Sequence, residues 1–292
     1  MSTMSLAAAQ AAVTPSGIFE LVLDSVLRAG WPAASILAAW ALGVFRDYHI
    51  RGPRRTDEDE PTAMLLLILL AGLSAMFLGA AGAAAILTPR GQTIAGQVHF
   101  TPTQEIIVET TSSAAVVFVI VTMTASMRPR GLHYLGLERG GIMRGILIGV
   151  VALAIAWPLV MLVSEFMDWF CVNIYRFNPA EHELLDQVQN SSRAGKALGV
   201  VVAVVLAPLS EELVFRGYFQ TILRRWVSPW TAVIVASALF AMAHDAWSQP
   251  AIFLLALCLG YVYERTGNLW ANITMHSLFN LTSVALFILG SH

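Results

Sequence analysis

The sequence predicts an all-α, polytopic membrane protein of about eight transmembrane helices. Of its 292 residues, 57% are hydrophobic and only 12% are charged, which is about half the charged fraction usual in soluble domains. The apolar residues gather in runs, and crossing the hydrocarbon core of a bilayer takes about 20 such residues. No Gly/Ser-rich linker and no repeat of fixed period divides the chain. These observations predict one membrane-embedded domain.

The candidate spans follow one another along the chain. Six runs are long and mainly apolar, at 29–45, 61–89, 106–127, 145–164, 226–243 and 246–263. Two more contain polar residues: 197–210 runs into Glu211 and Glu212, and 266–291 contains His276. Each run predicts a membrane helix from its length and hydropathy. Residues 1–16 are rich in Ala, Ser and Thr and predict a disordered tail, which leaves 17–292 as the membrane domain.

The charged residues indicate orientation and exclude one class of partner. The net charge is −2, and 16 of the 17 cationic residues are Arg, scattered between apolar runs and not gathered on one face. Nucleic acid is therefore not expected as a partner. The first, third, fifth and seventh connections hold 12 of the cations, so the positive-inside rule places that side in the cytoplasm and both termini outside. The Arg-rich, Lys-poor composition favours a bacterial inner membrane.

The first polar motif is Glu211-Glu212 with Arg216. An ionisable residue inside a membrane helix is costly and is therefore a candidate for function. Adjacent helical residues point about 100° apart, whereas Glu212 and Arg216 are one turn apart and can pair. We expect Arg216 to neutralise Glu212 and Glu211 to remain available for proton transfer. The alternative is a helix end that carries ordinary interfacial charges.

Two further motifs place His residues in or beside spans. Phe240 and His244 are one turn apart at the end of the sixth run, where a lone His often serves as a cap or an interfacial residue. His276 and Asn280 are one turn apart inside the last run, so both can present donors to one point. His and Asn can also simply hold membrane helices together.

In this order, on three predicted helices, the patterns EExxxR, FxxxH and HxxxN resemble the CPBP family of intramembrane proteases, also called Abi or CAAX-protease-like. The resemblance covers roughly residues 140–290, and no motif is matched in the N-terminal helices. It implies a glutamate-dependent endopeptidase with a conical active-site cavity inside the membrane that opens to the cytoplasm. The substrate would be a membrane-associated protein or peptide, and no cofactor would be needed.

Peptide hydrolysis needs an activated water and a stabilised oxyanion, and the motif residues supply both. Glu211 is the expected general base, and His244 would share and orient the water. His276 and Asn280 would donate to the oxyanion. Glu212, Arg216 and Phe240 would support the site.

Three other functions fit the same residues. Glu211, His244 and His276 could bind zinc as a carboxylate and two imidazoles, although the HExxH spacing of many zinc proteases is absent. A membrane scaffold or immunity protein could keep the fold without the chemistry. A transporter would be expected to show related halves, which are not seen.

The order of the spans sets a condition on this site. If the fifth and sixth spans were full-length and antiparallel, Glu211 and His244 would lie at opposite ends of them. The two can meet only if the sixth span is short or begins after an internal helix. We therefore expect the fifth helix to continue to about Arg225, Glu211 to lie near the middle of the membrane, and His244 to approach it.

Overall fold

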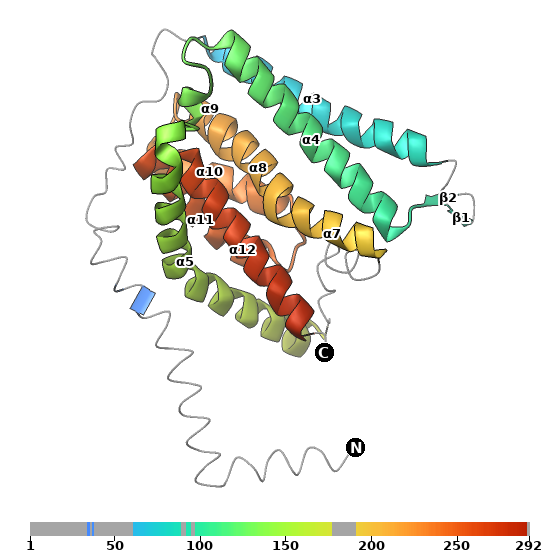
Figure 1. Ribbon diagram of the computed structural model, residues 1–292. Helices are drawn as coiled ribbons and strands as arrows, with labels where there is room; N and C mark the ends of the chain where they lie inside the picture. The colour runs from blue at the N-terminus through green and yellow to red at the C-terminus, as the bar shows by residue number, and fades with distance from the viewer. Residues whose placement is uncertain are drawn as a thin grey trace, which may run out of the picture.

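The computed structural model describes residues 61–88, 92–94, 97–176 and 191–290, together with residues 34, 35 and 37. The first predicted span and the predicted N-terminal tail lie outside the part described in full. The main helices are α3 (Thr62–Leu87), α4 (Pro102–Met127), α5 (Ile142–Phe170), α7 (Arg193–Val201), α8 (Ala207–Glu212), α9 (Thr221–Leu223), α10 (Pro229–Met242), α11 (Gln249–Thr266) and α12 (Leu269–Gly290) (Figure 1). The predicted all-α membrane fold is confirmed.

One short β-hairpin accompanies the helices. Strands β1 (Gln92–Ile94) and β2 (Gln97–His99) pair antiparallel, with Gln92 opposite His99 and Ile94 opposite Gln97. They lie between α3 and α4, which pack side by side as an antiparallel pair (Figure 1).

Polar caps set where several helices begin. Thr101 accepts a hydrogen bond from the Gln104 backbone N–H, and the Gln104 side chain accepts one from the Thr101 N–H, which forms a capping box at the start of α4. Ser192 caps α7, and Ser228 caps α10. Each cap satisfies backbone N–H groups that the first helical turn leaves without a partner.

The fifth predicted span is one continuous helix over Arg193–Leu223. It contains two π-helical segments, Val202–Leu206 and Leu213–Gln220, on either side of α8. Such segments are rare, and they occur frequently at functional sites. The helix ends two residues before the expected Arg225, and the glutamates of α8 lie well inside it. We refer to Arg193–Leu223 as the central helix.

Helices α10 and α11 form a short hairpin beside one half of the central helix. Along α11, Ala256, Gly260 and Glu264 contact in turn Arg216, Gln220 and Arg224, so α11 runs parallel to the central helix. Helix α10 has 14 residues, about 21 Å, against a hydrocarbon core of about 30 Å. The hairpin therefore turns back at the depth of the glutamates, and the condition of a short sixth span is met.

Helix α12 packs on α5 through small residues. A Cβ added at Gly149 would lie 2.6 Å from the Ala271 carbonyl oxygen, and one at Gly145 would lie 2.6 Å from the Trp270 Cβ. The Gly-xxx-Gly spacing thus lets the two helix backbones approach closely, as membrane helices often do. Because α12 carries His276 and Asn280, this contact also positions the site.

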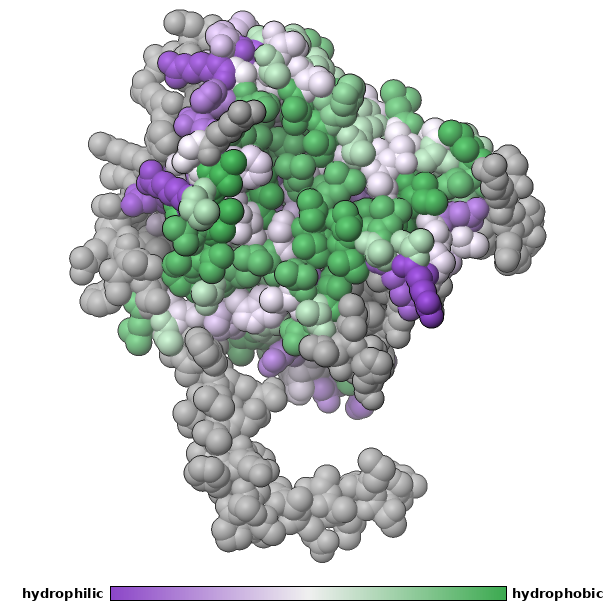
Figure 2. Space-filling view, in the orientation of Figure 1, coloured by the Kyte–Doolittle hydropathy of each residue, from purple (hydrophilic) through white to green (hydrophobic). Residues whose placement is uncertain are grey.

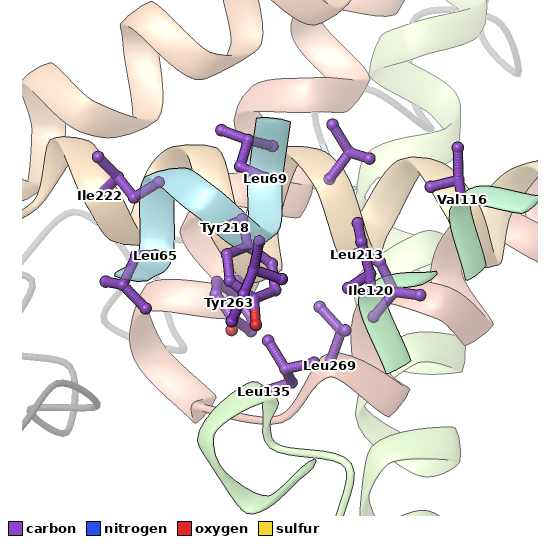
Figure 3. Packing of buried hydrophobic residues seen from close by; sticks show 12 residues of the cluster. Leu65, Leu69, Val116, Ile120, Leu135, Leu213, Tyr218, Ile222, Tyr263 and Leu269 are labelled. Carbon is purple, nitrogen blue, oxygen red and sulfur yellow. The ribbon is translucent and has the colours of Figure 1, made fainter. Parts of the chain in front are cut away.

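An apolar core lies on the side of the central helix that faces α3 and α4. Figure 3 shows Tyr218 and Tyr263 at its middle, surrounded by aliphatic side chains from several helices. Its buried members are Leu65, Ile68, Leu69, Val116, Ile120, Leu135, Leu213, Val214, Tyr218, Ile222, Tyr263 and Leu269. The Tyr218 hydroxyl is 2.6 Å from the Thr124 Oγ1, which satisfies both groups away from water.

The outer surface and the arrangement of the helix ends fit a membrane protein. Four helices of the described part are long and apolar enough to cross a membrane: Thr62–Leu87, Pro102–Met127, Ile142–Tyr175 and Arg193–Leu223. Figure 2 shows apolar side chains gathered over the middle of the visible face. At one end of the bundle, Arg225 donates to the Thr62 Oγ1 and Asn268 donates to the Gly141 carbonyl. The structure thus brings the third, fifth and seventh connections, all Arg-containing, to the same end, which we call the arginine end.

Candidate active site

Glu212 is the centre of a buried polar network. Its side chain has no exposed area, and its Oε1 accepts from the Arg216 Nη1 at 2.8 Å and from the His276 Nδ1 at 3.0 Å. Its Oε2 accepts from the Asn272 Nδ2 at 3.3 Å. Three donors, one of them the Arg216 cation, therefore compensate the buried carboxylate, as burial of a charge requires. The predicted Glu212–Arg216 pair is present.

The same face of the central helix stays polar toward the arginine end. One turn beyond Arg216, the Gln220 Nε2 donates to the Gly260 carbonyl and to the Glu264 Oε1. Another turn on, the Arg224 Nε is 3.1 Å from the Glu264 Oε2. This ladder of side chains at four-residue spacing joins the central helix to α11 and fills the space between them.

Glu211 has a different environment from its neighbour. Its side chain is 31% exposed, and its Oε2 lies 3.7 Å from the His276 Nε2. That separation exceeds a hydrogen-bond length but lies within ion-pair range. His276 is itself buried and donates from Nδ1 to Glu212, because a carboxylate can only accept. One imidazole thus lies between the two glutamates, and Glu211 is the one with access to a reactant.

Phe240 organises the aromatic side of the site. Its ring is 1% exposed and lies 4.5 Å from the Arg216 guanidinium carbon, which stacks over it. The His276 ring lies edge-on to it at 5.8 Å, and the His244 ring lies at 4.9 Å. Phe240 therefore contacts both histidines and supports Arg216 by a cation–π contact.

His244 lies just beyond the end of α10, at the turn of the α10–α11 hairpin. Its Nδ1 is 2.9 Å from the Phe240 carbonyl oxygen, so Nδ1 carries the proton in that contact. Nε2 is then the nitrogen through which the ring can exchange a proton with another group. The structure brings His244 and His276 to the same aromatic side chain, although they come from different helices.

Asn280 makes a contact between helices. Its Nδ2 donates to the Ala203 carbonyl at 2.8 Å. In this π-helical segment each carbonyl pairs with the N–H five residues later, as the Val202 carbonyl does with the Ala207 N–H. The donor expected for the Ala203 carbonyl is therefore the N–H of residue 208. Pro208 has no N–H, and Asn280 supplies the missing donor. This contact matches the helix-joining alternative, and only the second N–H of Asn280 remains for an oxyanion.

The zinc alternative needs three ligands in one place. Within the part of the chain that the structure describes, no three His, Cys, Asp or Glu side chains lie close enough to hold a metal ion. Glu211 and His276 are near each other, and His244 is associated with Phe240 instead. The geometry therefore gives the zinc alternative no support.

Sequence reasoning missed two residues near the site. Asn272 lies one turn before His276, holds Glu212, and also donates to the Leu259 carbonyl at 2.7 Å. Its spacing from His276 was a signal for the same face. Glu109 lies inside a run that was grouped with the apolar ones, in α4, which packs against the segment that carries Glu211. An acidic residue within that run was itself the signal.

Comparison with known proteins identifies the part of the chain that carries this site. Residues 193–282 match the family model for "Type II CAAX prenyl endopeptidase Rce1-like". This range contains every motif residue described above. The resemblance found from the motifs is confirmed over that range.

Three curated relatives are similar to different shares of the chain. The UPF0177 protein YxdF of Lactococcus lactis is 25% identical, over 46% of this chain and 89% of its own length. A 24.3 kDa protein of Escherichia coli is 28% identical over 34% of this chain and 48% of its own length. The protein YpbD of Bacillus subtilis is 29% identical over 28% of this chain and 41% of its own length. No solved structure matches the chain significantly.

Proposed function

We propose that the chain hydrolyses a peptide bond of a membrane-associated protein or peptide with a water that Glu211 activates. The proposal starts from the match of residues 193–282 to the CAAX-type intramembrane protease family. The observation that carries the proposal is the contrast between two adjacent carboxylates. Glu212 is fully buried and held by three donors, whereas Glu211 is partly exposed and contacts His276. Only Glu211 can meet a water and a substrate.

The proposed reaction assigns each proton. The Glu211 carboxylate takes a proton from water while the water oxygen attacks the carbonyl carbon of the peptide bond. The carbon–nitrogen bond then breaks, and the proton held by Glu211 passes to the leaving amine. Neither a metal nor a redox step is required. The hydrolysis is balanced by one water consumed for each bond cleaved.

The neighbouring side chains support Glu211 in different ways. His276 donates to Glu212 through Nδ1 and faces Glu211 with Nε2, so in its protonated form it attracts and orients the Glu211 carboxylate. We assign His244 the sharing and orienting of the water, through Nε2. The oxyanion role proposed for His276 and Asn280 depends, for Asn280, on the N–H that Ala203 does not use.

A comparison of membrane proteins in cells tests the proposal. Cells would carry the wild-type chain, the Glu211→Gln variant or the control variant Glu138→Gln, whose residue lies in an exposed loop. We expect a set of new protein termini with the wild type and the control that is absent with Glu211→Gln. Identical sets of termini in all three cultures, at equal expression, would contradict proteolysis by Glu211.

A further inference from the structure

Glu109 is an acidic side chain placed inside a membrane span. It is the eighth residue of the 26-residue α4, about 12 Å from its start. Its Oε1 accepts a hydrogen bond from the Ser113 Oγ at 3.0 Å, and Ser113 is 5% exposed. No cation of the described residues forms an ion pair with Glu109. A carboxylate in this position costs free energy unless a group of opposite charge or water meets it.

Glu109 lies on the face of α4 that packs against the central helix. It shares that face, by helical spacing, with Ile106, Ser113, Ile120 and Thr124. These four side chains are buried, whereas Glu109 is exposed. Glu109 is therefore the one exposed member of this set, with buried side chains before and after it along the same face.

Glu109 lies on the side of Glu211 away from the arginine end. Helix α4 runs parallel to the central helix, because Thr103 contacts the Ser192 N–H near their starts and Thr124 contacts Tyr218 farther along. Glu109, only six residues after Thr103, is thus displaced from Glu211 toward the start of the central helix. Helix α4 nevertheless packs against α8, the segment that carries Glu211.

The charges around Glu211 are not balanced by the described residues. Glu109, Glu211 and Glu212 are three carboxylates. Their ion-pair partners among the described residues are one guanidinium, Arg216, and one imidazole, His276. With all three carboxylates ionised, these partners leave an excess of negative charge even when His276 is protonated. A substrate with a cation at the level of Glu109 would remove that excess.

We propose that Glu109 is a specificity-determining residue that binds a Lys or Arg side chain of the substrate, a short distance along the peptide from the bond that Glu211 hydrolyses. This inference rests on the proposed function. It places the substrate between α4 and the central helix, on the Glu109 side of Glu211, with Ser113 holding the Glu109 carboxylate in place.

Cleavage-site mapping tests this assignment. The purified full-length chain in lipid vesicles would be incubated with a library of peptides derived from a digested proteome, and cleaved bonds would be identified by mass spectrometry. We expect wild-type sites to carry Lys or Arg at one fixed position near the cleaved bond. Glu109→Gln should reduce that preference about tenfold, as expected for loss of a close charge pair, and Glu109→Lys should shift it toward Asp or Glu.

The control variant is Asp168→Asn, which removes one exposed acidic charge from α5, where Glu165 is the interacting neighbour. It should leave the preference unchanged. Wild-type cleavage that depends on Glu211 but shows no basic preference, or a preference that Glu109→Lys does not alter, would overturn the role of Glu109 alone. Absence of any cleavage that depends on Glu211 would overturn the proposed function as well.

Discussion

The two sides of the Glu211-Glu212 pair differ in how completely their polar groups are satisfied. Toward the arginine end, Glu212, Arg216 and Gln220 are buried and bonded to α11 and α12. Toward the start of the central helix, the α10–α11 hairpin has ended, Glu211 is partly exposed and Glu109 is exposed. One side of the site thus holds the helices together, and the other can receive a substrate. Adjacent residues in the sequence can serve these separate purposes because helical neighbours point about 100° apart.

The largest effect on stability is expected from Glu212→Gln. The change leaves the buried Arg216 guanidinium without its countercharge, and breaking a buried ion pair costs about 3–5 kcal/mol. Thermal unfolding of the purified protein in detergent should show a lower midpoint than that of the wild type. A Glu212→Gln protein as stable as the wild type would show that the network does not hold the helices.

The second-largest effect is expected at His276, whose ring contacts both Glu212 and Glu211. In His276→Phe, a ring remains beside Phe240, but the donor to Glu212 and the contact with Glu211 are lost. We expect cleavage to fall at least as far as the roughly 100-fold typical of losing a positioned acid–base group, together with a loss of stability. His276→Phe with wild-type turnover would exclude the orienting role.

Asn280→Ala distinguishes the two roles considered for that residue. Loss of the hydrogen bond to the Ala203 carbonyl should cost about 1 kcal/mol of stability, with little change in turnover per folded molecule. Removal of an oxyanion donor would instead reduce turnover about 100- to 1,000-fold. Measuring both quantities on one preparation decides whether Asn280 joins helices or contacts the reacting atoms.

The smallest effect is expected from metal removal. If Glu211 activates water directly, a chelator should leave the cleavage rate unchanged, and the purified protein should contain no stoichiometric zinc by elemental analysis. One zinc per chain, lost with activity and restored with it, would instead support a site built from Glu211, His244 and His276.

Much of the site could be predicted because its signals are local. A charged residue in an apolar run, and a partner one turn away, are visible in the sequence, which is why Glu212–Arg216 and the Phe240–His244 turn were expected. The antiparallel order of the fifth and sixth spans also required a short sixth span, or one that begins after an internal helix, for Glu211 and His244 to meet.

The remaining features depend on contacts between distant segments. The spacing placed Asn280 one turn after His276. Its hydrogen-bond partner is the Ala203 carbonyl, 77 residues earlier, which has no backbone donor because Pro208 lacks an N–H. The π-helical segments around α8 have no sequence signature of their own, and they alter which side chains of the central helix face α11. The exposure of Glu109 depends on the packing of α4, which carries no family motif.

The most direct test of the central claim is a paired measurement on Glu211→Gln and Glu212→Gln, with unfolding temperature and cleavage of one identified substrate determined for both. The different surroundings of the two carboxylates predict that Glu211→Gln abolishes cleavage and unfolds at the wild-type temperature, whereas Glu212→Gln unfolds at a lower temperature. A Glu211→Gln protein that cleaves at the wild-type rate, or one that loses stability as Glu212→Gln does, would contradict the division between a reacting and a structural glutamate.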